Sequence, residues 1–214
     1  MEHSSFTTGL DAAFAKLAAR KQLSYDDVLA THKILFDAVY PWAGEDRLMN
    51  ASRLVVSKGN DKDKVVFAYP QDVRRSIDYA LEHGQDKKFM AAKPGEVMGY
   101  LAYGHPFLDG NGRTIMVLHC ILAQRAGFSI DWASSSKNDY IAALTKELEE
   151  PGKGHLDTYL KPFIKNAVSQ GGLAANVAAA PGLDGEGEDV VLGNTDDPEL
   201  KAQYEAQEFK RKQR

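Results

Sequence analysis

His105-Pro106-Phe107-Leu108-Asp109-Gly110-Asn111-Gly112-Arg113-Thr114 is the stretch around which this chain is built. It brings together an imidazole, a carboxylate, a carboxamide, a guanidinium and two glycines, and an apolar run of good helix formers follows it over 114–123. This pattern predicts a loop that leads into a helix N-terminus. The first backbone N–H groups of a helix have no partner within the helix, and the helix dipole is positive there, so the loop forms an anion site.

Three residues of the loop suit a phosphate. Gly110 and Gly112 allow positive φ and let a phosphate approach the main chain without a Cβ in the way. Arg113 can hold phosphate oxygens with its planar guanidinium, which matches them better than the ammonium of a lysine. We therefore expect the phosphates of a nucleotide to bind here.

The other polar residues add chemistry. Asp109 supplies a hard oxygen ligand for a Mg²⁺ ion that bridges phosphates and keeps waters. His105 is the group in the loop that can take up a proton at neutral pH. Asn111 can orient a phosphate or the loop itself. A G-N-G turn before a helix is common by itself, but all these roles in one loop predict a nucleotide site with a general base.

This loop resembles the signature of Fic-domain proteins, H-P-F-x-D/E-G-N-G-R-x-x-R. The resemblance extends over about 23–168 and includes Tyr40-Pro41-Trp42-Ala43-Gly44, which is similar to an upstream Y-P-W-A-G stretch of that family. It implies a mostly α-helical Fic-type domain with one β-hairpin flap and a C-terminal tail. It also implies a protein adenylyltransferase that moves AMP from ATP to a Ser, Thr or Tyr hydroxyl of a target protein.

The resemblance assigns roles within the signature loop. His105 would be the general base that deprotonates the target hydroxyl, and Asp109 would hold Mg²⁺ on the α- and β-phosphates. Phe107 would anchor the loop in the core. The nucleotide-binding residues would be Gly110, Asn111, Gly112 and Arg113.

One residue departs from the signature. Met116 stands where the family has its last arginine, which contacts the terminal phosphate and pairs with a glutamate of an inhibitory helix. Phosphocholine-transferring Fic enzymes and death-on-curing toxins also lack this arginine, but the toxins have a lysine where this chain has Gly112. Met116 is therefore either core packing or the sign of another nucleotide donor or a weakened enzyme.

A β-hairpin is expected over 52–69. Two β-rich runs, 53–57 and 65–69, flank a polar turn with lysines at 58, 62 and 64. By resemblance this is the flap, which pairs main chain to main chain with an extended segment of the target. The alternative is a surface hairpin without a role. The expected target-docking residues are Val55, Val56, Ser57, Lys58, Gly59, Val65, Val66 and Phe67.

Most of the remaining pattern is helical and places the Fic domain at 1–168. Ser24 is the expected N-cap of a helix that carries His32 on its core face, where a structural histidine is the better interpretation than a metal ligand. Pro70 and Pro94 are each expected at the first position of a helix. A last core helix is expected over about 156–168.

The C-terminal part has a different composition. The stretch 169–196 is rich in Gly and Ala and then acidic, which predicts a disordered linker, and 197–214 predicts a short helix. Thr145 with Glu149 and Thr195 with Glu199 have the spacing of the family's inhibitory motif, S/T-x-x-x-E-G/N, but neither is followed by Gly or Asn. With Met116 also in place, we expect no intramolecular lock of that type. An inhibitor would be a separate small protein.

Composition limits the other function classes. A net charge of −4 over 214 residues gives no general attraction to nucleic acid or to acidic membranes. Cys120 is the single cysteine, lies in an apolar run and is expected to pack rather than react. No apolar run spans a membrane and no N-terminal signal is present, which predicts a cytoplasmic protein or one delivered into another cell by a signal-independent route.

Two other functions remain open at this stage. The domain could be a degenerate module that binds a nucleotide or a partner through the flap. It could also be a Mg²⁺-dependent phosphodiesterase that removes AMP.

Overall fold

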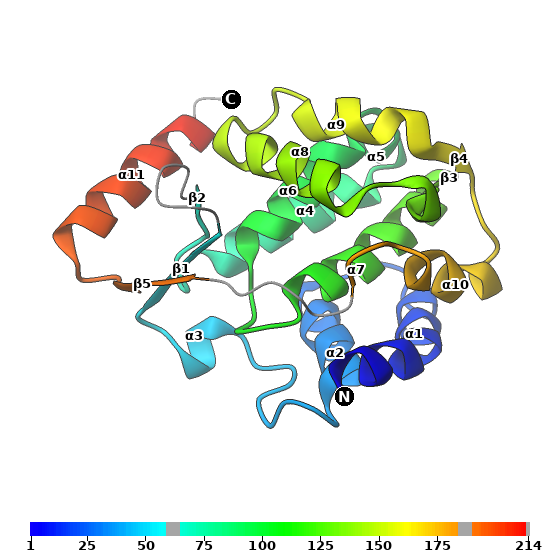
Figure 1. Ribbon diagram of the computed structural model, residues 1–214, viewed down its shortest axis with the longest axis horizontal. Coiled ribbons are helices and arrows are strands. Elements are labelled where there is room, and N and C mark those ends of the chain that lie inside the picture. Colours follow the sequence, from blue (N-terminus) through cyan, green and yellow to red (C-terminus); the bar gives the residue numbers. More distant parts are fainter. Residues whose placement is uncertain (59–64, 184–189, 213–214) are drawn as a thin grey trace.

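The computed structural model describes residues 1–58, 65–183 and 190–212, and the fold there is mostly α-helical, as the sequence predicts (Figure 1). The helices are α1 Glu2–Ala18, α2 Tyr25–Phe36, α3 Arg47–Asn50, α4 Val73–Gln85, α5 Lys87–Ala92, α6 Pro94–Gly104, α7 Asn111–Ala126, α8 Lys137–Glu149, α9 His155–Leu160, α10 Leu173–Ala178 and α11 Pro198–Lys212. The strands are β1 Leu54–Lys58, β2 Val65–Val66, β3 Phe128–Ile130, β4 Ile164–Asn166 and β5 Val190–Asn194.

Helix α7 runs through the centre of the molecule. It contacts α1, α2, α4, α5, α6 and α10, and its residues from Arg113 to Ala123 are all buried. Gly127, in the left-handed conformation with φ 95°, ends it. Because the loop 105–110 leads directly into this helix, the packing of the core fixes where the N-terminus of α7 points.

The helices around α7 begin largely where the sequence predicts. Ser24 caps α2, with its N–H donating to the Asp27 carboxylate at 3.0 Å, and Pro94 begins α6. Helix α4 begins at Val73 instead, because 69–72 form a turn in which Asp72 N–H donates to Tyr69 O. The prediction that Pro70 starts this helix is therefore wrong.

The expected hairpin is present and belongs to a larger sheet. Strands β1 and β2 pair antiparallel, with Ser57 opposite Val66 and Lys58 opposite Val65. Strand β5 pairs antiparallel with the other side of β1, so the order is β2-β1-β5. The expected docking residue Gly59 lies outside the described residues, as do the lysines at 62 and 64.

The prediction of a disordered linker over 169–196 is wrong for its described part. A 3₁₀ turn at Gln170–Gly172 leads into α10, which buries Leu173 and Val177 against the core, and β5 supplies the third strand of the sheet. Two apolar residues one turn apart bury a helix face although the stretch around them is rich in Gly and Ala. The helix expected over 197–214 corresponds to α11.

The helix expected over 156–168 is also wrong in its second half. Helix α9 ends at Leu160, a 3₁₀ turn with Pro162 follows, and β4 then pairs with β3. Proline has no N–H for the helix and its ring clashes with the preceding turn, so the chain leaves the helix there.

None of the helices in the described part of the chain has the length and the apolar character of a membrane span.

Candidate active site

The loop between α6 and α7 is held in one shape by its own side chains and turns. His105 adopts the left-handed conformation with φ 44°, and Gly110 does so with φ 75°. The Asn111 carboxamide closes the loop, because its Oδ1 accepts from Phe107 N–H and its Nδ2 donates to Phe107 O, both at 2.8 Å. Both ends of the Asn111 side chain are thus used on the loop, which favours the loop-shaping role.

The two glycines of the loop differ in their surroundings. A Cβ on Gly110 would lie 2.7 Å from Phe36 Cε2 and 3.1 Å from His32 Nε2, so the loop packs there too closely for a side chain. A Cβ on Gly112 would meet nothing within 4 Å. Gly112 is exposed in the first turn of α7, where it leaves the N-terminus of the helix open to a ligand.

His32 supports the loop from below and is a structural histidine, as predicted. Its ring stacks on Phe107 with centroids 3.7 Å apart, its Nε2–H donates to Asp109 O at 3.0 Å, and its Nδ1 accepts from Gly44 N–H at 3.0 Å. Burial lowers the pKa of His32 to about 4. The neutral ring therefore ties the signature loop to the Trp42-Ala43-Gly44 loop.

Arg47 is a positioning residue whose role is not predicted from the sequence. Its side chain is fully buried, and its guanidinium donates to three backbone carbonyls. These are His105 O at 2.8 Å, Ala68 O at 2.7 Å and Leu54 O at 3.3 Å. The Arg47 guanidinium thus joins the signature loop to the start of β1, at Leu54, and to the segment that follows β2, at Ala68. In the sequence, Arg47 lies shortly after the Trp42-Ala43-Gly44 stretch, but no sequence feature indicates which carbonyl groups its side chain contacts.

His105 faces a pocket beneath the hairpin. Its ring is parallel to that of Phe67, with centroids 3.8 Å apart, and is 7% exposed. The pocket, of about 60 Å³, lies between β2, the start of α7 and α8. It is lined by Val65, Phe67, Ala102, His105, Asn111, Gly112, Ile115, Ile141, Leu144, Thr145 and Leu148. The pocket thus combines one imidazole and a helix N-terminus with mostly apolar walls.

Asp109 and Arg113 belong to a second cluster, on the side of α1 and α2. Arg113 is 4% exposed, lies 3.5 Å from the Asp109 carboxylate, and donates through Nη2 to Glu2 Oε2 at 3.2 Å. Its guanidinium lies over the Phe36 ring, 4.6 Å from the centroid. Its Nη1 is buried and has no hydrogen-bond partner within the described part of the chain. An unsatisfied guanidinium nitrogen favours an anion as the missing partner.

Glu2 is the residue of this cluster that the sequence did not indicate. Its Oε1 accepts from Tyr40 O–H at 2.7 Å. This hydrogen bond, and after it Arg113, lower the pKa of the Glu2 carboxyl. The contact between Glu2 and Arg113 joins residues that are 111 positions apart, so no local sequence motif predicts it.

The glutamates singled out in the sequence take no part in this cluster. Glu149 is exposed at the end of α8, and Glu199 is exposed in the first turn of α11. Thr145 lines the pocket, where its hydroxyl donates to Ile141 O at 2.9 Å. The glutamate that pairs with Arg113 is Glu2 of α1.

Two further residues of α7 are core residues. Met116 is 4% exposed and does not line the pocket, which favours packing as its role in this fold. Cys120 is buried, and burial raises its thiol pKa to about 12. A thiol that stays protonated is not a nucleophile, so the prediction that Cys120 packs is confirmed.

The described residues contain no group of three or more His, Cys, Asp or Glu side chains that could hold a metal ion. Asp109 is the acidic residue of the signature loop, and its side chain is 53% exposed. A single accessible carboxylate fits a Mg²⁺ ion that takes its other ligands from phosphates and water, and does not fit a metal held by protein alone.

Comparison with known proteins shows which family the sequence of this chain matches. Residues 22–123 match the sequence model of the Fic/DOC family. The chain is 34% identical over 111 residues to the protein adenylyltransferase VbhT of Bartonella schoenbuchensis, which covers 50% of this chain and 22% of VbhT. It is 24% identical over 133 residues to the probable protein adenylyltransferase y4lH of Sinorhizobium fredii, which covers 58% of this chain and 65% of y4lH. The chain thus spans about a fifth of one relative and just under two thirds of the other.

Solved structures share the fold. The N-terminal Fic domain of a VirB-translocated Bep effector protein from Bartonella quintana, solved with bound ADP, superposes with a TM-score of 0.62 at 20% identity. That match covers 78% of this chain and 85% of the other. The BepC protein of Bartonella tribocorum, solved with bound AMPPNP, superposes with a TM-score of 0.58 at 14% identity, covering 77% and 87%.

Proposed function

Because residues 22–123 form a domain of the Fic/DOC family, we propose that the chain transfers AMP from ATP to a Ser, Thr or Tyr hydroxyl of a target protein. The observation that carries the proposal is that His105 and the N-terminus of α7 line one pocket beneath the hairpin. Related proteins that carry the name protein adenylyltransferase, and Fic structures with bound ADP or AMPPNP, support it.

In the proposed reaction, the target hydroxyl oxygen attacks the α-phosphorus of ATP and pyrophosphate leaves. His105 accepts the hydroxyl proton, since an imidazole can take up a proton at neutral pH. Stacking on Phe67 and the hydrogen bond from Arg47 to the His105 carbonyl hold the ring and its backbone in place. Positioning and neutralisation of phosphate charge supply most of the rate enhancement in transfers of this kind.

The phosphates would bind at the start of α7. The N–H groups of its first turn lack helical partners, and Gly110 and Gly112 leave the backbone accessible. Asn111 supports this anion site by closing the loop, and Arg113 offers its unpartnered Nη1. Asp109 would hold Mg²⁺, which would neutralise phosphate charge. Glu2 accepts from Nη2 of the same guanidinium, so phosphate binding at Nη1 in this account places a second anion beside the Glu2 carboxylate.

The nucleoside would enter the apolar part of the pocket, between β2 and α8. A planar base suits walls made of Phe67, Ile115, Ile141, Leu144 and Leu148. The space of about 60 Å³ is much smaller than a typical nucleotide-sized pocket, which holds roughly 300 Å³ or more. Binding therefore requires the hairpin and α8 to separate.

The target would dock on the hairpin by strand addition, which presents a hydroxyl to His105 without side-chain recognition. Strand β1 is paired on both sides, with β2 and with β5, so a target strand could add only at the edge of β2. Of the docking residues expected from the sequence, we therefore propose Val65, Val66 and Phe67, whereas Val55, Val56, Ser57 and Lys58 belong to the central strand and Gly59 lies outside the described residues. Among those described, Phe67 has a further role as the ring stacked on His105.

The test is to incubate the protein with ATP, Mg²⁺ and a cell lysate, and to measure the mass added to modified peptides. The proposal predicts the mass of AMP on a Ser, Thr or Tyr. Met116 leaves no arginine at the last signature position, so a parallel reaction with CDP-choline tests the phosphocholine alternative. Binding of ATP with no mass added to any protein would instead support a non-catalytic binding module.

A further inference from the structure

The chain's own C-terminal segment occupies both sides of the hairpin. On one side, β5 pairs with β1. The other side is the outer edge of β2. Phe67 N–H points toward β1, since it donates to Val56 O. The carbonyl of Val66 belongs to the same peptide unit and points the opposite way, so it faces away from β1. Gln207 Nε2 of α11 donates to that outward carbonyl at 2.6 Å. The edge of β2 that faces away from the sheet is therefore held by α11.

Other contacts hold α11 against the domain, one of them at a wall of the pocket that contains His105. At the middle of α11, the Tyr204 ring stacks on that of Tyr69, with centroids 3.8 Å apart, and its hydroxyl donates to Asp72 at 2.7 Å. Near its end, Arg211 Nη2 donates to Leu148 O at 2.6 Å. Leu148 belongs to α8, one wall of the pocket, and β2 is the opposite wall. Helix α11 thus bridges the two walls that must separate.

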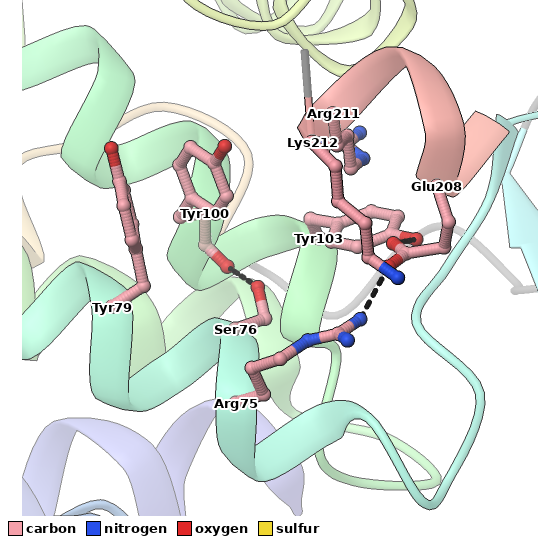
Figure 2. A pocket seen from close by; sticks show the side chains of 8 residues that line it. All are labelled: Arg75, Ser76, Tyr79, Tyr100, Tyr103, Glu208, Arg211 and Lys212. Atoms are coloured by element: carbon pink, nitrogen blue, oxygen red, sulfur yellow. Dashed lines mark hydrogen bonds and ion pairs between the residues drawn. The ribbon is translucent and has the colours of Figure 1, made fainter. Parts of the chain in front are cut away.

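The junction beneath the end of α11 is polar and incompletely filled, as Figure 2 shows. A cavity of about 190 Å³ is lined there by Arg75, Ser76, Tyr79, Tyr100, Tyr103, Glu208, Arg211 and Lys212. Glu208 accepts from Tyr103 O–H at 2.6 Å and pairs with Arg75, whose side chain is 53% exposed. The Glu208 side chain itself is only 10% exposed, so the weakness of this junction lies in its cavity, where the lining atoms lack packing partners. An opening of α11 that leaves the core around α7 folded would begin at this cavity.

We propose that α11 is a displaceable cover of the target-docking edge. It keeps the β2 edge occupied until an extended segment of a target protein replaces Gln207 at the Val66 carbonyl with its own backbone N–H. The partner is thus a peptide segment in β conformation, which is the class of ligand that strand addition accepts. The identity of this partner as a substrate rests on the proposed function, whereas the opening of α11 does not.

Hydrogen exchange of the full chain tests the opening directly. In the wild type, amides of α11 are expected to exchange through local opening, faster than those of α7. Tyr204→Ala, which removes the ring stacked on Tyr69, is expected to raise α11 exchange rates by about tenfold or more and to change α7 rates less. Lys210→Ala, on the exposed side of α11, is the matched control. Exchange of α11 and α7 at one common rate would show that α11 leaves only on global unfolding and would overturn the proposal.

Transfer of label from α-labelled ATP to lysate proteins tests the consequence. Gln207→Ala removes the hydrogen bond to Val66 and leaves the Tyr204 contact, so labelling is expected to rise several-fold over the wild type and over Lys210→Ala. Labelling by Gln207→Ala and Tyr204→Ala at or below the wild-type level would contradict a cover. An absence of label with every variant would count against the proposed function, and the exchange rates would then decide whether α11 opens.

Discussion

Replacement of Arg47 tests how the signature loop and the hairpin are joined. Arg47→Met keeps an apolar chain of similar length and removes the donors to His105 O, Leu54 O and Ala68 O. The hydrogen bonds to His105 O and Ala68 O are buried, so these two backbone carbonyls lose their partner with no water to replace it, whereas Leu54 O is partly exposed. Hydrogen bonds from a charged group contribute about 1.5–3 kcal/mol each, and removal of one side of a buried charged interaction costs about 3–5 kcal/mol.

We therefore expect Arg47→Met to lower the free energy of unfolding by about 3–5 kcal/mol, a large part of the roughly 5–15 kcal/mol of a typical domain. The measurement is equilibrium unfolding in urea followed by circular dichroism. Arg74→Met, at a side chain 64% exposed on α4, is the control and is expected to cost less than about 1 kcal/mol. Equal, small losses for both variants would refute the role assigned to Arg47.

Three further results are expected. Gly110→Ala should lower the free energy of unfolding by about 2 kcal/mol or more, because it adds a steric clash at a residue with positive φ. Gly112→Ala should keep the stability of the wild type and lose affinity for ATP. Equal stabilities of the two variants would contradict the packing at position 110. Glu2→Gln, which removes the charge beside Arg113, should tighten ATP binding by about threefold or more in titration calorimetry, and unchanged affinity would show that Glu2 does not oppose phosphate binding. The pKa of His32, measured by NMR, should be near 4, below its ordinary value of 6.5. The neutral ring then contributes stability that is fully present above about pH 6.5 and is lost toward pH 4 at about 1.4 kcal/mol per pH unit. A midpoint near 6.5 would contradict its burial as a neutral ring.

Local signals in the sequence predicted the parts of the site that are close in the chain. The capping residue Ser24, the proline at 94 and the glycines at 110 and 112 indicate where helices begin, because backbone conformation at such positions depends on the residue itself. The loop 105–113 could thus be placed before a helix, and His105, Asn111 and Gly112 do share a pocket. Their roles in catalysis and binding remain predictions.

Contacts between distant segments could not be predicted in this way. Strand β5 forms from a Val-Val-Leu run after an acidic stretch, and its partner β1 lies more than 130 positions earlier, so only the folded chain shows the pairing. The same holds for Glu2 at Arg113 and for Gln207 at Val66. At Pro162 two local signals conflict, and the missing N–H of proline outweighs the apolar period that favours a helix over 156–168.

The most direct test of the central claim compares transfer of label to lysate proteins from α-labelled and γ-labelled ATP, in the presence of Mg²⁺, by the wild type and by His105→Asn. Asparagine is chosen because residue 105 holds φ 44°, which asparagine tolerates better than alanine, so the loop is kept while the proton acceptor is lost. Relative to lysate without added protein, the account predicts that the wild type adds label from α-labelled ATP and none from γ-labelled ATP, and that His105→Asn lowers the added label by about a hundredfold or more. Label from γ-labelled ATP, or equal labelling by the two proteins, would contradict it.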